Sequence, residues 1–320
     1  MFVAAVVAAG IAAVVLLPQG RPPVFARVSA SSALFVGAPP GWSFDDLAPG
    51  RHRGEVVVAA TDLTAGLEPQ RLFVVQVPSR RIRRLPIPVS RRCGAYSDQF
   101  PQRLHDGRLA FVRYCLGRVG SPVGRSVRLL VLDEATHRLR RFVPYQLPFF
   151  VRRFAISRGG RGVINDGRGL SERLQWLRPA KLQAVRGSWT RVGDPAWSPD
   201  GTRLAVATTQ YGDRSTAPPV AWALRLLGRD GAAITTVLTG IADPSRPSWS
   251  PDGRRIALRM TLNGSQGLFV IDLGNRSVRL VRRGRSFSEV LWSPDGHVLY
   301  ATVSRARAAR HSGLQTIDLP

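Results

Sequence analysis

Short runs of apolar residues recur along the chain from residue 55 onward, and clusters of Gly, Pro, Asp and Ser separate them. Two stretches, 129–141 and 268–281, consist of an apolar run, a short polar turn and a second run in which apolar and polar residues alternate. That alternation is typical of a half-buried β-hairpin, because successive side chains of a strand point to opposite faces. The pattern predicts an all-β protein built from short strands.

The pentapeptide Trp-Ser-Pro-Asp-Gly occurs three times, at residues 197–201, 249–253 and 292–296. Pro fixes φ in a tight turn, Asp bonds nearby backbone groups, and Gly adopts the left-handed conformation of a bulged hairpin. An apolar run follows each copy, so we expect strand, turn and strand, with the Trp as a buried anchor against the next sheet. The residues that define the repeat are Trp197, Asp200, Gly201, Trp249, Asp252, Gly253, Trp292, Asp295 and Gly296.

The spacing of these turns is regular. The turn glycines of the three clear copies are residues 201, 253 and 296, and weaker copies place glycines at 54, 107 and 160. The first repeat contains predicted strands at 56–60, 72–77 and 81–85. Repeats of about 40–50 residues with four strands each are typical of propeller blades. The sequence therefore predicts a six-bladed β-propeller.

The three clear copies and the strands that follow them resemble the WD40-like repeats of TolB-type β-propellers. They span residues 195–320, and the weaker copies extend the likeness to about residue 51. The resemblance implies a fold but no single function, because such blades occur in binding proteins, in extracytoplasmic scaffolds and as caps on peptidases. The chain differs from TolB itself, since residues 18–50 are too few for the α/β domain that precedes the TolB propeller.

The N-terminal residues 1–17 are uncharged and almost wholly apolar. Their length is short for a membrane span and slightly long for the core of a signal peptide. We interpret residues 1–18 as a membrane anchor; the alternatives are a cleaved signal and a buried element of the propeller. Residues 19–31 would be a linker. Arg21 and Arg27 favour a cytoplasmic body by the positive-inside rule, but the whole body is rich in Arg, so this count discriminates poorly.

The last repeat supplies runs at 290–292, 298–303 and 314–319 and then lacks an outer strand. A propeller must close its ring, and a strand from the opposite terminus commonly completes the last blade. We therefore expect the apolar residues 32–37 to pair beside 314–319, which gives a propeller over 32–320. The alternative is that 32–37 belong to a disordered linker.

The chain has two cysteines, Cys93 and Cys115. Both are expected near the open end of the inner hairpin of the second repeat, so a disulfide between them is geometrically plausible. A disulfide requires an oxidising compartment. The alternative is a pair of free, buried cysteines.

The formal net charge is +25, and Lys181 is the one lysine among 46 basic residues. Arginines cluster at 80–92, 276–285 and 305–310. One explanation is an Arg-rich composition spread over solvated strand positions. The other is an acidic partner such as a cell-wall polymer, anionic lipid or nucleic acid. We do not expect nucleic acid, because the clusters lack interleaved aromatic residues and a groove-reading element.

No catalytic, metal-binding or cofactor-binding residue is predicted. The chain contains no Gly-x-Ser-x-Gly elbow, zinc-protease motif or phosphate loop. The five histidines are scattered without metal-ligand spacing. A site assembled from loops at the central channel would leave no local motif and stays open.

The sequence leaves three functions open. The first is a monomeric, non-enzymatic scaffold at the extracytoplasmic face of a bacterial membrane, which binds a protein or an acidic envelope polymer. The second is a hydrolase or lyase with carboxylates at the channel, for which acidic residues with perturbed pKa values would be evidence. The third is a cytoplasmic polyanion-binding protein, for which free thiols would be evidence.

Overall fold

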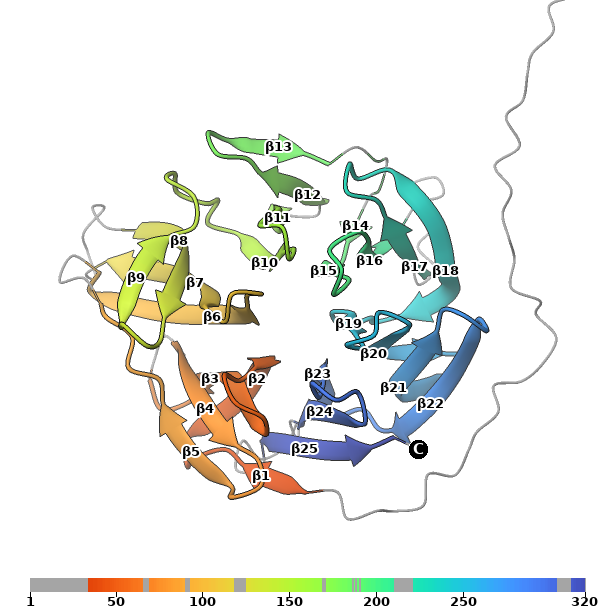
Figure 1. The fold of residues 1–320 in the computed structure, drawn as a ribbon, viewed down its shortest axis with the longest axis horizontal. Helices are drawn as coiled ribbons and strands as arrows, with labels where there is room; N and C mark the ends of the chain where they lie inside the picture. Colours follow the sequence, from red (N-terminus) through yellow and green to blue (C-terminus); the bar gives the residue numbers. More distant parts are fainter. Residues whose placement is uncertain are drawn as a thin grey trace, which may run out of the picture.

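The computed structural model describes residues 34–65, 69–89, 93–117, 125–168, 171–185, 187, 189, 191–209, 221–303 and 312–319. Within these ranges the chain forms strands and turns but no helix. The strands make antiparallel sheets that stand around a ring, as in a β-propeller (Figure 1). The all-β prediction is confirmed.

The first three sheets each have four strands in chain order. The first consists of β2 (Trp42–Pro49), β3 (Glu55–Asp62), β4 (Gln70–Gln76) and β5 (Arg81–Arg84). The second consists of β6 (Ala95–Arg103), β7 (Leu109–Gly117), β8 (Arg125–Asp133) and β9 (Arg138–Arg141). The third consists of β10 (Val151–Ile156), β11 (Gly162–Arg168), β12 (Ser171–Leu177) and β13 (Leu182–Ala184).

A nine-stranded sheet follows, in which the short pairing of Ile241 and Ala242 with Leu262 and Thr261 joins two successive sets of strands. The first set is β14 (Arg191–Val192), β15 (Ala196–Trp197), β16 (Leu204–Thr209), β17 (Trp222–Leu227) and β18 (Ala233–Ala242). The second is β19 (Ser248–Trp249), β20 (Arg255–Leu262), β21 (Ser265–Asp272) and β22 (Ser277–Arg283).

The last sheet joins the two ends of the described chain. Its strands are β23 (Phe287–Trp292), β24 (Val298–Val303), β25 (Gly313–Asp318) and, outermost, β1 (Phe35–Gly37). Val36 lies opposite Leu314, and Leu34 N–H donates to Thr316 Oγ1 at 2.9 Å. The pairing falls where the sequence predicts it, and it fastens the beginning of the ring to its end (Figure 1).

The core lies between neighbouring sheets, so each sheet is covered on both faces. One apolar cluster joins Val57 and Leu72 of the first sheet to Leu109 and Phe111 of the second. Consequently the strand interior 56–60 is fully buried at every position. Burial on both faces explains why these strands read as continuous apolar runs rather than as alternating ones.

All six turn glycines adopt the left-handed conformation, with φ between 67° and 81°. In the three clear copies the Asp side chain holds the turn. At the first, Ser198 Oγ donates to Asp200 Oδ1 at 2.5 Å, and Thr202 N–H donates to the same oxygen at 3.0 Å. Asp252 and Asp295 accept equivalent bonds in their own turns. These bonds lower the pKa of each aspartate, to about 2 for Asp295, so the turns stay charged at neutral pH.

The tryptophans tie each repeat to its neighbour. Trp249 Nε1–H donates to Ala196 O, and Trp292 Nε1–H donates to Ser248 O, both at 3.0 Å. From the preceding repeat, an arginine two residues after the turn glycine covers each ring. Arg255 Cζ lies 4.6 Å from the centroid of Trp292, and its Nη2 donates to Gly296 O at 3.3 Å. Arg203 makes the same two contacts, with Trp249 and Gly253.

Replacement of Arg255 by methionine is expected to lower the free energy of unfolding by about 1 kcal/mol, because a cation–π contact and one hydrogen bond are lost. Urea denaturation measures this change. Arg254→Met is the matched control, since Arg254 is exposed at the adjacent position and should change stability by less than about 0.5 kcal/mol. Equal effects of the two substitutions would refute the coupling.

The predicted anchor or signal, the predicted linker, and residues 32–33 lie outside the described residues. Across the described ranges, no helix has the length and apolar character needed to cross a bilayer.

Candidate functional site

Six residues, one from each sequence repeat, meet near the middle of the ring. We call this set the central hub; it consists of Asp46, Phe100, Arg153, Asp194, Arg246 and Glu289. Five of them lie seven positions before the turn glycine of their repeat. Asp46 lies eight before, because Gly54 comes one position later in its turn. The six hub residues thus occupy equivalent positions in the six repeats, and closure of the ring brings them close together.

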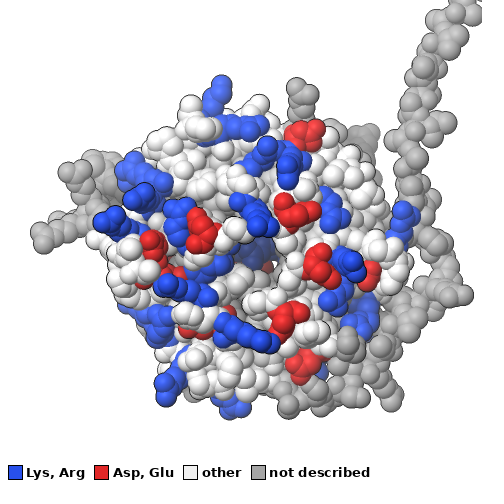
Figure 2. Space-filling model, viewed as in Figure 1, with Lys and Arg blue, Asp and Glu red and all other residues white. Residues whose placement is uncertain are grey.

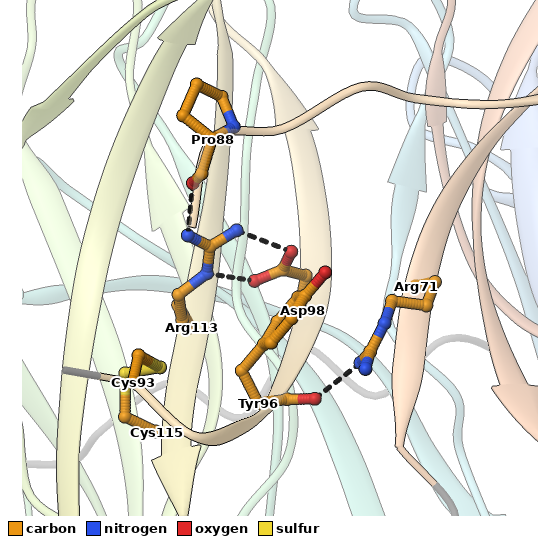
Figure 3. The surroundings of a disulfide bond; sticks show 7 residues. All are labelled: Arg71, Pro88, Cys93, Tyr96, Asp98, Arg113 and Cys115. Atoms are coloured by element: carbon orange, nitrogen blue, oxygen red, sulfur yellow. Dashed lines mark hydrogen bonds and ion pairs between the residues drawn. A yellow bond between two sulfur atoms is a disulfide. The ribbon is translucent and has the colours of Figure 1, made fainter. Parts of the chain in front are cut away.

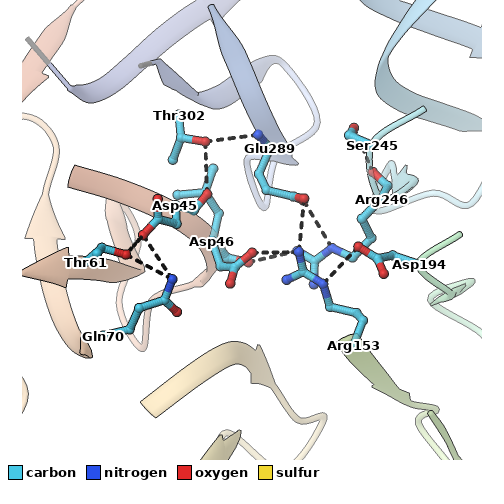
Figure 4. A network of polar contacts seen from close by, with 11 residues as sticks. Asp45, Asp46, Thr61, Gln70, Arg153, Asp194, Ser245, Arg246, Glu289 and Thr302 are labelled. Carbon is cyan, nitrogen blue, oxygen red and sulfur yellow. Dashed lines mark hydrogen bonds and ion pairs between the residues drawn. The ribbon is translucent and has the colours of Figure 1, made fainter. Parts of the chain in front are cut away.

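Arg153 of β10 is the centre of the hub (Figure 4). Its Nη2 lies 2.6 Å from Asp46 Oδ1 and 3.0 Å from Glu289 Oε1, and its Nε lies 3.2 Å from Asp194 Oδ2. Its side chain is only 5% exposed, whereas that of Asp194 is 25% exposed. One buried guanidinium therefore pairs with carboxylates from three separate parts of the ring, and Asp194 gives the hub contact with solvent.

Arg246 supplies the second positive charge. Its Nε lies 3.6 Å from Glu289 Oε2, and its Nη2 donates to Leu47 O at 2.8 Å. The backbone is held as well, since Glu289 N–H donates to Thr302 Oγ1, which in turn donates to Asp45 O. The hub therefore fixes the innermost strands of the first and last sheets relative to each other (Figure 4).

Phe100 is the apolar member. The centroid of its ring lies 4.8 Å from Arg153 Cζ. Its φ is 56°, in the left-handed region that a bulky residue rarely adopts. The register of β6 shifts between Gln99 and Gln102, so the strand bulges at this point. Bulges re-aim side chains beside functional sites, and this one directs the ring under the guanidinium.

Burial dominates the electrostatics of the hub. It raises the pKa of Glu289 to about 7, although Arg153 and Arg246 oppose this shift. Burial also raises the pKa of the adjacent Asp45 to about 6, against the effect of a hydrogen bond from Thr61. Burial lowers the pKa of Arg153, but the carboxylates around it outweigh this effect and raise it above the ordinary value. Chemically, Glu289 is a carboxyl group that can take up or release a proton near neutral pH.

The raised pKa of Glu289 predicts a pH-dependent stability. The ordinary pKa is 4.5, so between about pH 4.5 and about pH 7 the folded protein holds a proton that the unfolded chain has released. Stability should therefore fall as the pH rises through this window. Glu289→Gln should flatten the curve, leaving the part due to Asp45 and Asp98, whose pKa values burial also raises. Unfolding free energies from urea denaturation across the window test this, and an unchanged slope in the variant would contradict it.

The residues predicted from the sequence lie elsewhere. The aspartates of the Trp-Ser-Pro-Asp-Gly turns bond within their own turns, and Asp295 also pairs with Arg53 at 2.9 Å. The hub was not among the predictions from the sequence. The signal was present, because counting back seven residues from the turn glycines gives Arg153, Asp194, Arg246 and Glu289.

Cys93 and Cys115 form a disulfide, as the sequence predicts, with their Cα atoms 5.1 Å apart (Figure 3). Beside it, Arg113 Nε and Nη2 hold Asp98 at 2.6 and 2.8 Å. Both of these side chains are almost fully buried. The disulfide and this ion pair together fix the start of β6 against the end of β7.

The ring is hollowed near its middle, and basic and acidic side chains are interspersed around the hollow (Figure 2). In the part of the chain that is described, no group of three or more His, Cys, Asp or Glu is arranged to hold a metal ion.

No family model matches the chain. It is 30% identical over 116 residues to an uncharacterized peptidase, YuxL, of Bacillus subtilis (35% of this chain, 17% of that protein). It is 36% identical over 87 residues to the Tol-Pal system protein TolB of Alcanivorax borkumensis (26% of this chain, 19% of that protein). The matches thus span less than a fifth of the length of either relative.

Solved structures share the fold over more of the chain. TolB from Acinetobacter baumannii matches 74% of this chain and 56% of its own, with 12% identity and a TM-score of 0.51. An oligogalacturonate lyase in complex with manganese matches 88% of this chain and 92% of its own, with 14% identity and a TM-score of 0.52. The resemblance to TolB-type β-propellers is confirmed at the level of the fold. One neighbour is a lyase, so the fold alone leaves function open.

Proposed function

We propose that this protein is a non-enzymatic binding scaffold at the extracytoplasmic face of a bacterial membrane, and that its partner is an acidic envelope polymer or a protein. The observation that carries the proposal is the row of exposed arginines on the outer strands. Strands β5 and β9 read Arg-Ile-Arg-Arg and Arg-Leu-Arg-Arg, and every arginine in them is exposed. Because the strands belong to a closed ring, these exposed arginines are held in fixed positions before a partner binds.

The nine-stranded sheet counts as two blades in this proposal. Each of its two sets carries one Trp-Ser-Pro-Asp-Gly turn and one hub residue. With the four four-stranded sheets this makes a six-bladed propeller over residues 32–320, preceded by a linker (19–31) and an anchor or signal (1–18).

The location outside the cytoplasm is supported by the disulfide between Cys93 and Cys115, since disulfides persist in oxidising compartments. Thiol labelling in intact cells and in protein denatured without reductant tests it. Resistance to labelling until a reductant is added supports the location. Free labelling after denaturation would favour a cytoplasmic polyanion-binding protein instead.

Retention on an immobilised acidic polymer tests the partner. We expect the purified protein to bind polygalacturonate beads at low salt, to elute as salt rises, and to pass through beads of neutral dextran. The salt dependence follows because arginines that bind a polyanion release condensed counterions. Failure to bind the acidic beads would exclude an acidic polymer as the partner and would favour a protein partner.

A second candidate is an enzyme with its site at the hub. Glu289, with a pKa of about 7, has the proton affinity of a general acid or base. Its neighbours argue against this role, because Arg153 and Arg246 already engage the carboxylate. Incubation with oligogalacturonate, the substrate in the name of one structural neighbour, provides a test. Formation of unsaturated product by the native protein but not by Glu289→Gln would favour the enzyme.

A further inference from the structure

The interface between the first two sheets gathers an excess of positive charge. Five arginines line it, and we call them the arginine groove: Arg71, Arg84, Arg113, Arg128 and Arg141. Among the described residues, Asp98 is the one carboxylate that pairs with any of them, through Arg113. Counted as five guanidiniums against this carboxylate, four positive charges have no ion-pair partner in the described part of the chain, although Asp62 lies close enough to Arg71 for a Coulombic interaction between them.

The second sheet contributes three of these arginines. Leu130 and Leu132 of β8 face the core shared with the first sheet, so Arg128, two residues earlier, faces the same way. Arg113 lies directly opposite Arg128 on β7, and Arg141 lies opposite Leu130 on β9. Arginines on three consecutive strands thus run from the buried Arg113 to the exposed Arg141.

The first sheet contributes Arg71 and Arg84, and Tyr96 lies between Arg71 and Arg113 (Figure 3). Arg71 Cζ lies 3.8 Å from the centroid of the Tyr96 ring, and Arg113 Cζ lies 4.9 Å from it. Arg84 Nη2 donates to the Tyr96 hydroxyl at 3.2 Å. One aromatic ring therefore holds three guanidiniums together, with the most buried of them bound to Asp98.

This arrangement is electrostatically unfavourable by itself. Burial lowers the pKa of Arg71; Tyr96 and Asp98 oppose this shift, and the nearby Arg84 and Arg113 add to it. Burial and Arg141 lower the pKa of Arg128 in the same way. Arg128 Nε is buried and has no hydrogen-bond partner among the described residues. Like charges held together in a partly buried site are stabilised when an anion binds them.

Arginine is unevenly distributed over the outer strands. Strands β13 and β18 contain none, whereas β5 and β9 carry three each and β22 carries Arg279, Arg282 and Arg283. What distinguishes the first two sheets is that arginines from both of them meet around one aromatic ring, that of Tyr96.

We infer that the arginine groove binds a linear polymer that carries repeated carboxylate or phosphate groups. Arg113 is buried and its guanidinium is taken by Asp98 and Pro88 O, so Arg128 and Arg141, on neighbouring strands about 4.8 Å apart, are the members of this row that can meet a ligand. Two such guanidiniums side by side suit consecutive charges along a chain, each held by one forked group. The inference rests on the proposed function and names the site and the chemistry of its polymer.

The test compares two double variants. Arg128→Gln/Arg141→Gln removes two charges from the groove, and Arg158→Gln/Arg254→Gln removes two exposed charges from turns of other sheets. Polygalacturonate supplies carboxylates and polyphosphate supplies phosphates. We expect the groove variant to bind the favoured polymer about tenfold more weakly and to lower the slope of log K against log salt by about two. The control should stay within about twofold of the native protein.

Each outcome decides something. Equal loss in both double variants overturns the assignment of the groove and leaves the proposed polymer binding intact. No binding of either polymer by the native protein overturns the groove assignment and excludes the acidic polymer, which leaves a protein as the partner. A preference for one polymer identifies the charged group. Thermal denaturation checks folding, and the groove variant should melt no lower than the native protein, because repulsion is relieved. If it does not fold, Arg84→Gln tests the same groove from the exposed side.

Discussion

Replacement of Arg153 by methionine is expected to lower the free energy of unfolding by about 3–5 kcal/mol, the largest effect of any single substitution considered. Methionine keeps most of the side-chain volume but removes the charge, so Asp46 stays buried without its counter-charge and Glu289 keeps only the more distant Arg246. An unpaired carboxylate in a site of low polarity is far more costly than the pair is favourable. Urea denaturation at neutral pH measures the loss.

The effect of Arg153→Met should also depend on pH. Without the guanidinium the carboxylates gain a proton more readily, so the difference from the native protein should shrink as the pH is lowered. Arg153→Lys, which keeps the charge but loses the forked geometry, should have an intermediate effect. Arg140→Met removes an exposed arginine and is the control. A loss in Arg153→Met no larger than that of this control would show that the hub does not hold the ring.

Removal of the disulfide is expected to lower the free energy of unfolding by about 3 kcal/mol, because Cys93 and Cys115 are 22 positions apart in the sequence and the link restricts the unfolded chain. For a chain of this size the melting temperature should fall by roughly 5–10 °C. The double variant Cys93→Ala/Cys115→Ala, followed by thermal denaturation, measures the change. Alanine is the appropriate replacement, since both cysteines are buried and a serine hydroxyl would need a partner.

Reduction of the native protein provides the control for that experiment. With dithiothreitol it should melt close to the double variant, and the double variant should not respond to the reductant. A native protein whose melting temperature is insensitive to reduction would contradict both the disulfide and the inferred oxidising compartment.

The strands that could be predicted from the sequence are those with continuous apolar runs. The predicted runs 56–60 and 72–77 correspond to β3 and β4. Strand β2 was not predicted, because Trp-Ser-Phe-Asp-Asp-Leu-Ala-Pro contains two adjacent aspartates and ends in Pro, all unfavourable in a strand. Asp46 is accommodated there because Arg153, far along the chain, neutralises it. The polar residues that hid the strand are those that build the hub.

The sequence by itself determined the features that depend on neighbouring residues. Ser, Pro, Asp and Gly fix the turns through local φ preferences and local hydrogen bonds, and the apolar runs fix the strands between them. From these the ring, its repeats and the disulfide could be predicted. The tertiary structure decided the central hub and the arginine groove. Each assembles charges from different repeats of the chain, and whether a charge is paired or uncompensated depends on what the closed ring places around it.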